Sequence, residues 1–186
     1  RMHRVCTPVI ASLLVCASGA AGGLVSIDFN GLADNGAEWS GDTFADLGVL
    51  FATVPGGRLR SFGDSGTPYF SPFVFASVPG SPASDGPIEA AFAAGADFVS
   101  FEVVDGGGPN AQWTAQAFGF GGQLLDELVG DQGRPGGLTT FVTLVRPEGD
   151  IARVVFTPST DFEGIDNLSF NPVPGPGVPS LVIASF

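Results

Sequence analysis

The sequence predicts an all-β fold, an antiparallel β-sandwich of the jelly-roll kind. Glycine and proline are abundant, with 28 and 15 residues among 186, and only 14% of the residues are charged. Both residue types disfavour helix interiors and favour tight turns. A hydrophobic fraction of 44%, which includes 17 Phe, is ample for one core. The composition therefore predicts a single domain of many short strands.

Apolar runs bounded by Gly, Pro, Asp and Asn recur along the chain, as in short strands joined by turns. No segment has a convincing amphipathic helical pattern, which favours a sandwich. Residues 31–46 and 63–86 are rich in turn-forming residues, and we expect them to form long loops that carry any binding surface. The predicted strands cover residues 25–29, 48–54, 58–62, 73–77, 88–92, 98–105, 111–118, 123–128, 139–145, 151–157 and 165–170.

Alternation along two of these strands predicts which side chains form the core. Val99, Phe101 and Val103 alternate with three other residues, two of which are polar. We therefore expect Val99, Phe101 and Val103 to face the core. Trp113 shares its predicted face with three Ala, while Gln and Thr occupy the opposite face. We therefore interpret Trp113 as a core residue rather than a platform for sugar stacking.

The last predicted strand, within FEGIDNLSFNPVPGP, runs into a segment rich in Pro and Gly. Such a segment cannot continue a sheet, so we expect the sandwich domain to span residues 24–171. We also expect this strand to pair with residues 27–29 and close the sandwich. Strict alternation would place Asp166, Leu168 and Phe170 on one face and Ile165, Asn167 and Ser169 on the other.

Residues 1–21 have the pattern of a signal peptide. Two Arg and one His lie among the first four residues, an apolar run continues to Cys16, and small residues follow. We expect cleavage near Ala20 or Ala21. The alternative interpretation is a buried strand or helix. An exported protein, at the cell envelope or outside the cell, is the expected outcome.

Removing residues 1–21 would remove both Cys and the only His, and the chain contains no Lys. Ser-His-Asp and Cys-His catalysis, Schiff bases and the usual zinc sites would then be excluded. The net charge of −12 disfavours nucleic acid and anionic membrane surfaces as partners. Carboxylate chemistry remains, but Asp126 and Glu127 are adjacent and would face opposite sides of a strand.

Four phrases of the sequence resemble bacterial exported proteins of the PEP-CTERM type. They are IDFNGLADNG, LGVLFATVPGG, WTAQAFGFGGQLLDE and FEGIDNLSF. The resemblance covers most of the chain after residue 24. It implies a C-terminal sorting signal that is processed at the cell envelope, often in organisms that make exopolysaccharide.

The tail, residues 172–186, departs from the pattern of this family. Val173, Pro174, Gly175 and Pro176 stand where the family has V-P-E-P, and the apolar segment behind them falls far short of the roughly 20 residues that span a bilayer. We expect either a truncated or a degenerate sorting signal. Membrane attachment would require such a tail in the full-length chain.

A structural calcium ion is the cofactor we consider. In jelly-roll modules that this chain resembles, the first and last strands often lie side by side and an ion sits where they meet. Calcium takes six to eight oxygen ligands. The candidate ligands here are Asp28, Asn30, Asp34 and Asp166. The alternative is that Asp28 and Asp166 accept hydrogen bonds from backbone amides of nearby turns.

Trp39 and Tyr69 are the candidate ligand-binding residues, because aromatic side chains in loops stack on sugar rings. The same side chains would also suit a contact with another surface protein. The alternative is that they cap the ends of the sandwich.

These patterns together predict an exported, non-enzymatic binding or structural module, with polysaccharide or surface proteins as partners. Two alternatives stay open. One is a purely structural surface protein without a ligand. The other is a carboxylate-only glycoside hydrolase, which requires two facing acids about 5 to 9.5 Å apart.

Overall fold

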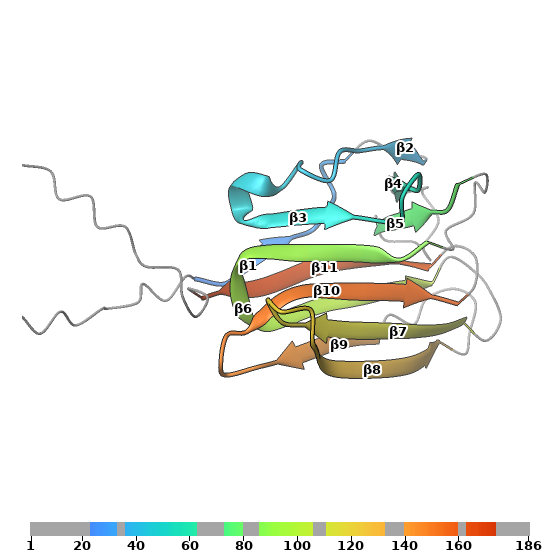
Figure 1. The fold of residues 1–186 in the computed structure, drawn as a ribbon. Helices are drawn as coiled ribbons and strands as arrows, with labels where there is room; N and C mark the ends of the chain where they lie inside the picture. Colours follow the sequence, from blue (N-terminus) through green and yellow to red (C-terminus); the bar gives the residue numbers. More distant parts are fainter. Residues whose placement is uncertain are drawn as a thin grey trace, which may run out of the picture.

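The computed structural model describes residues 23–32, 36–62, 73–79, 86–105, 111–132, 140–159 and 163–173. Every strand pair in these ranges is antiparallel, which confirms the predicted antiparallel β-sandwich (Figure 1). The elements are β1 (Val25–Ile27), β2 (Ala37–Glu38), the 3-10 helix η1 (Ala45–Leu47), β3 (Val49–Ala52), β4 (Arg58–Phe62), β5 (Phe73–Ser77), β6 (Ile88–Asp105), β7 (Ala111–Phe118), β8 (Leu124–Gln132), β9 (Thr140–Val145), β10 (Ile151–Pro158) and β11 (Glu163–Pro172).

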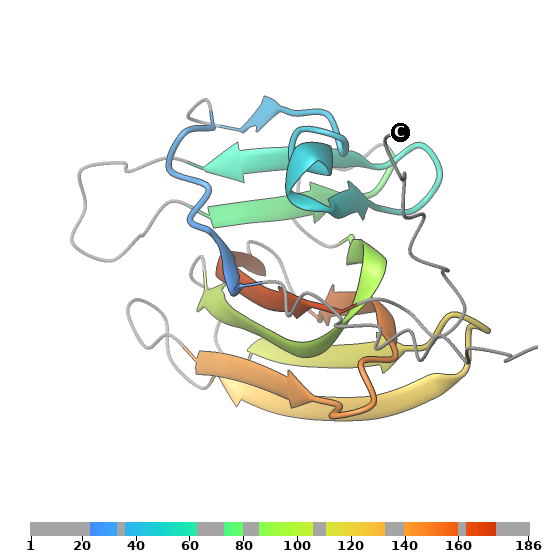
Figure 2. The ribbon, with the colours of Figure 1, turned by 90° about the vertical axis from the view of Figure 1, so that its left-hand side faces the viewer.

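Strand β6 is a single strand of 18 residues where the sequence predicts two strands. Its first half pairs with β3 and β10, and its second half pairs with β11 and β9. Gly95 lies between the halves with a φ of 78°, a conformation that residues other than glycine rarely adopt. The bend at this point, visible in Figure 2, lets one strand contribute to both sheets of the sandwich.

The two sheets follow from this pairing. One has the strand order β3-β6-β10-β7-β8, and the other has the order β9-β6-β11-β5-β4-β2. Strand β1 also pairs with β11, next to the point where β5 does. Both views place β2 at one end of the molecule and β8 with β9 at the opposite end (Figures 1 and 2).

The core lies between the two sheets and consists mainly of Phe, Val, Ile and Ala. Val99, Phe101 and Val103 are fully buried in it, as their alternation predicts. Trp113 has 5% of its surface exposed and packs in the same core, which confirms its interpretation as a core residue. Burial of large apolar side chains of this kind contributes about 1.5 to 3 kcal/mol each.

The predicted alternation of the closing strand is wrong at two adjacent positions, because Ile165 lies on the core face and Asp166 lies opposite Glu102 on the other face. Ile165 packs in the same core as Leu168 and Phe170, instead of facing away from them. The reason is a shift in the β11–β6 register between Asp166 and Ser169, where Asn167 adopts a φ of 50°. A bulge of this kind changes which side chains face inward.

The predicted pairing of the first and last strands is confirmed, since Ile27 of β1 lies opposite Leu168 of β11. The predicted loop over residues 31–46 contains β2 and the start of η1, which are too short to give a periodic signal. Within the described ranges, no helix has the length and apolar character needed to cross a bilayer. The predicted signal peptide, and the tail beyond Val173, lie outside the described residues.

Candidate functional site

Trp39 follows β2 and belongs to a group of four aromatic rings at one end of the core. Its ring lies 5.3 Å from that of Phe51 and 6.0 Å from that of Phe44, both in edge-on contacts. Phe29 completes the group, with centroids 5.6 Å from Phe44 and 5.7 Å from Phe51. Trp39 therefore caps the sandwich, as the alternative interpretation expects, and is only half-buried. Tyr69 lies outside the described residues.

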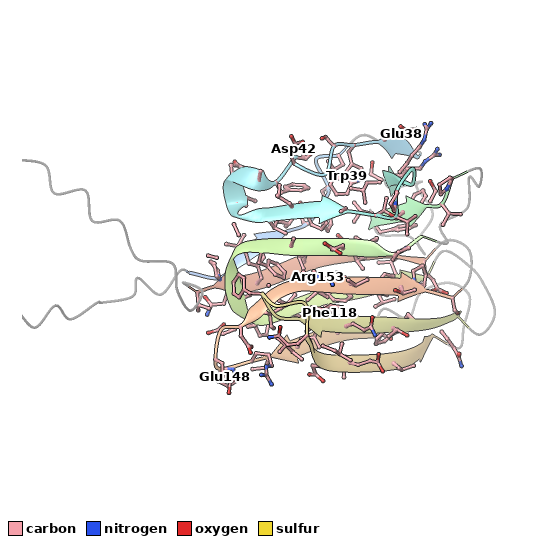
Figure 3. The ribbon with its side chains drawn as sticks, in the orientation of Figure 1. Glu38, Trp39, Asp42, Phe118, Glu148 and Arg153 are labelled. Carbon is pink, nitrogen blue, oxygen red and sulfur yellow. The ribbon has the colours of Figure 1, made fainter. Side chains whose placement is uncertain are left out.

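One side of Trp39 also borders a cavity of about 430 Å³, which we call the Trp39 pocket. It lies at the β2 end of the molecule, where Figure 3 shows Glu38 beside Trp39. A cavity of this size falls within the range of small-molecule sites, roughly 300 to 1,000 Å³. The pocket is lined by Glu38, Trp39, Gly41, Thr53, Val54, Pro55, Gly56, Gly57, Arg58 and Leu59.

The turn between β3 and β4 forms one wall of the pocket. The amide of Gly57 donates to the carbonyl of Val54 at 2.8 Å, and Gly56 has a φ of 80°. Pro55 followed by a glycine with positive φ is the pattern of a type II turn. On the opposite wall Gly41 lies so close to Phe51 that a Cβ would stand 2.0 Å from the Phe51 carbonyl oxygen. The local sequence thus holds both walls in place.

Two side chains of the Trp39 pocket carry buried polar atoms whose hydrogen bonding is incomplete. None of the described residues offers a hydrogen-bond partner to Nε1 of Trp39 or to Oγ1 of Thr53. Nε of Arg60 likewise has no hydrogen-bond partner among the described residues, and the Arg60 side chain contacts the pocket residue Glu38. Such an atom costs about 1 to 3 kcal/mol when it stays unpaired. A ligand or water that bonds to these atoms would recover that free energy.

The charged side chains of the pocket form a small network. Glu38 accepts a short ion-pair hydrogen bond from Arg58, and its Oε1 lies 3.6 Å from Nη2 of Arg60. Arg58 and Glu38 are about half exposed, so this pair contributes little to stability. Its effect is to orient a carboxylate and a guanidinium at the pocket rim, in a chain whose net charge is −12.

A comparable network joins β6, β10 and β7, away from the pocket, and Figure 3 labels its members Arg153 and Phe118. Nη1 of Arg153 bonds Oε2 of Glu89 at 2.7 Å, and its guanidinium carbon lies 4.2 Å from the ring centroid of Phe118. Arg153 is thus an ion-paired arginine that takes no part in the Trp39 pocket.

The structure describes three of the four predicted calcium ligands, and Asp34 lies outside the described residues. The amide of Asn30 donates to Oδ1 of Asp28 at 3.2 Å, and the amide of Asn167 donates to Oδ1 of Asp166 at 2.7 Å. These are the turn hydrogen bonds that the alternative interpretation expects. In the part of the chain that the structure covers, no group of three or more His, Cys, Asp or Glu is arranged to hold a metal ion.

Asp166 is unusual because it is a carboxyl group with only 3% of its surface exposed. Burial raises the pKa of Asp166 to about 7, although the hydrogen bond from the Asn167 amide lowers it. The negative charges of Glu102 and Asp28 raise it further. Nδ2 of Asn167 also donates to Oε2 of Glu102 at 2.6 Å. Sequence reasoning missed Glu102, which lies directly opposite Asp166 on β6.

A second cavity of about 420 Å³ lies beside β1 and β11. Among the described residues, Asp28 is the only carboxylate that lines it, and Glu38 is the only one that lines the Trp39 pocket. Asp126 and Glu127 do not form a facing pair, because Ala117 lies opposite Asp126 whereas Gln116 lies opposite Glu127 and bonds it at 2.6 Å. The described lining of each of these two cavities therefore contains a single carboxylate, whereas a glycosidase requires two facing ones.

Comparison with known proteins identifies similar folds but no family. No protein-family model matches the chain, and no curated protein matches it. The K2 cleaved adhesin domain of Lys-gingipain is similar with a TM-score of 0.51 and 13% identity, over 79% of this chain and 98% of that domain. At this identity the likeness shows the fold alone.

Two further solved structures are similar over most of their length. The K1 cleaved adhesin domain of Lys-gingipain from Porphyromonas gingivalis W83 has a TM-score of 0.47 and 14% identity, over 84% of this chain and 100% of that one. A family 11 carbohydrate-binding module from Clostridium thermocellum, in complex with a mixed-linked tetrasaccharide, has a TM-score of 0.37 and 13% identity, over 84% and 99% of the two chains.

Proposed function

We propose that this chain is an exported, non-enzymatic module that binds polysaccharide in the Trp39 pocket. One observation carries the proposal: Nε1 of Trp39 and Oγ1 of Thr53 are buried beside the pocket with no hydrogen-bond partner among the described residues. A sugar carries closely spaced hydroxyl and ring oxygens, which can accept a hydrogen bond from the Trp39 N–H and exchange one with the Thr53 hydroxyl. Binding would satisfy both groups at once.

The remaining side chains of the pocket support the same ligand class. Glu38 and Arg58 are planar groups that each bind two oxygens or hydroxyls, and the indole edge of Trp39 adds an apolar wall. Trp39 and Arg58 contribute only hydrogen-bond donors to the pocket, and Glu38 contributes only acceptors. The pocket can therefore bond both the oxygens and the hydroxyl protons of a sugar.

The non-enzymatic part of the proposal rests on the described linings of the two cavities, in each of which one carboxylate stands without a second. The sandwich fold shared with the K2 adhesin domain agrees with a binding role, at the level of fold analogy only. Export rests on the signal-like pattern of residues 1–21, and a place at the cell envelope rests on the resemblance to exported PEP-CTERM proteins. Export and the place at the cell envelope are therefore both parts of the proposal.

The test is affinity electrophoresis of the protein in gels that contain one polysaccharide each, from neutral glucans to polyuronates. We expect retardation by at least one of them, and loss of it in Arg58→Met. The control is Arg153→Met, which removes another ion-paired arginine outside the pocket and should leave the retardation unchanged. Absence of retardation across the panel would favour a purely structural surface protein.

A further inference from the structure

Strand β9 forms the edge of its sheet at the end of the molecule opposite β2 (Figures 1 and 2). Among the described strands it pairs only with β6. Its six residues, TFVTLV, include no charged residue and no Pro. Two large side chains on its outer face are exposed, Phe141 by 67% and Val145 by 55%.

Edge strands in soluble proteins normally carry a device that prevents pairing with another chain, such as a charged side chain, a Pro or a bulge. Strand β9 has none of these, and its register with β6 is continuous from Phe98 opposite Val145 to Val103 opposite Thr140. An edge that is regular, uncharged and apolar is suited to accept another strand. The remaining question is which strand it accepts.

We propose that β9 pairs antiparallel with β9 of a second copy of this chain, around a two-fold axis at Thr143. In that register Phe141 lies opposite the second copy's Val145, and Thr143 lies opposite the second copy's Thr143. Val142 and Leu144, which are both buried, then lie opposite one another on the core face. Each exposed apolar side chain gains an apolar neighbour, and the two sheets become continuous.

The sequence of β9 favours a second copy over an unrelated strand, because its pattern is self-complementary. Large apolar residues flank Thr143 symmetrically, at two positions on the outer face and two on the core face. An isologous two-fold interface requires this symmetry. Two copies that each carry a net charge of −12 repel one another, and an uncharged strand is where they can approach at the lowest cost.

The dimer has a consequence that rests on the proposed function. The sheet order from β9 to β2 runs through β6, β11, β5 and β4, so the Trp39 pocket lies at the far edge of the same sheet. With strands about 4.8 Å apart, two pockets at the ends of a joined sheet would be roughly 50 Å from each other. Such a dimer would link two polysaccharide strands, or bind one strand twice with higher avidity.

The test uses cysteine at the axis, in a chain whose two native cysteines are replaced by Cys6→Ser and Cys16→Ser. Residues that face one another in an antiparallel pair are close enough for a disulfide. We expect Thr143→Cys to form a covalent dimer in mild oxidant, in nearly full yield. The matched control, Thr157→Cys, is exposed on β10 and should stay at least ten-fold less cross-linked.

A second measurement distinguishes the dimer from chance collision. Sedimentation of the unmodified chain should show a dimer at micromolar concentration, and Thr143→Lys should convert it to a folded monomer by placing like charges at the axis. A chain that stays monomeric at high concentration would overturn the proposal, as would a dimer that survives Thr143→Lys. Polysaccharide retardation by the Thr143→Lys monomer would leave the proposed function intact while this inference failed.

Discussion

The indole ring of Trp39 packs edge-on against the ring of Phe51, with centroids 5.3 Å apart and an interplanar angle of 72°. The ring is therefore held by the core, while its Nε1 has no partner among the residues that the structure describes. Packing and hydrogen bonding can thus be separated at this residue by substitution. The apolar ring contributes to stability, and the N–H is the group that a ligand would bond under the proposed function.

Trp39→Phe should keep most of the ring packing and remove the N–H. We expect the free energy of unfolding to change by less than about 1.5 kcal/mol, because the substitution conserves an aromatic ring. Polysaccharide affinity should fall about five-fold to ten-fold, the value of one hydrogen bond. Trp39→Ala, by contrast, should destabilise by about 2 to 4 kcal/mol. Urea unfolding and affinity electrophoresis measure the two effects.

Gly130→Ala should destabilise the sheet that contains β7 and β8. Gly130 lies opposite Trp113, and a Cβ there would stand 2.0 Å from Cζ2 of the buried indole. Overpacking of this kind costs about 1 to 3 kcal/mol, or more where the neighbour cannot move. The neighbouring Val129→Ala, at an exposed position, should change stability by about 0.5 kcal/mol at most. Equal effects of the two substitutions in thermal unfolding would contradict the packing described here.

Asp166 should make the protein less stable as the pH rises from about 4 to about 7. Its pKa is about 7 in the folded chain, against 3.8 for an unperturbed carboxyl group. Between these values the unfolded chain releases the proton and the folded chain keeps it, so rising pH favours unfolding. The stabilising contribution of the protonated Asp166 is therefore fully present below about pH 4, and it has been lost above about pH 7.

Asp166→Asn provides the comparison, because the amide cannot ionise. The difference in unfolding midpoint between the unmodified chain and this variant should vary with pH over that window and level off above it. Carboxyl groups that do not interact with Asp166 affect both proteins equally and cancel in the difference. A difference that is the same at all pH values would show that the folded-state pKa of Asp166 is close to its ordinary value.

Calcium remains a prediction that depends on Asp28, Asn30, Asp34 and Asp166. An ion bound only by the folded state raises the melting temperature in proportion to its affinity and concentration. If the site exists, the melting temperature in excess calcium should be several degrees higher than the melting temperature in chelator. Asp28→Asn should remove most of this difference. Identical melting curves in calcium and chelator would exclude it.

The fold class and most strands could be predicted from the sequence, because alternation and turn residues are local signals. Val99, Phe101 and Val103 illustrate this, since their period of two is uninterrupted and all three are buried. The signal failed where the backbone departs from a regular strand. At Asn167 a bulge shifts the register, and at Gly95 a bend joins two predicted strands into one.

The candidate site could be predicted only in part. Trp39 was identified from its loop position, but Thr53 and Arg58 come from a later part of the chain, and the pairing of β2 with β4 is what brings that part next to Glu38 and Trp39. Glu102 was missed for the same reason, since its contact with Asn167 spans two strands. Contacts between strands that are distant in sequence have no local signature.

Thr53→Val tests the central claim most directly, because valine has nearly the same shape as threonine and lacks the buried hydroxyl. If Oγ1 of Thr53 is unpaired until a sugar binds, the variant should be as stable as the unmodified chain or up to about 1 kcal/mol more stable, yet bind polysaccharide about five-fold to ten-fold more weakly. Thr157→Val, at an exposed position on β10 away from both the pocket and β9, is the control and should bind normally. Stability that rises while binding is unchanged would contradict a polysaccharide site in the Trp39 pocket.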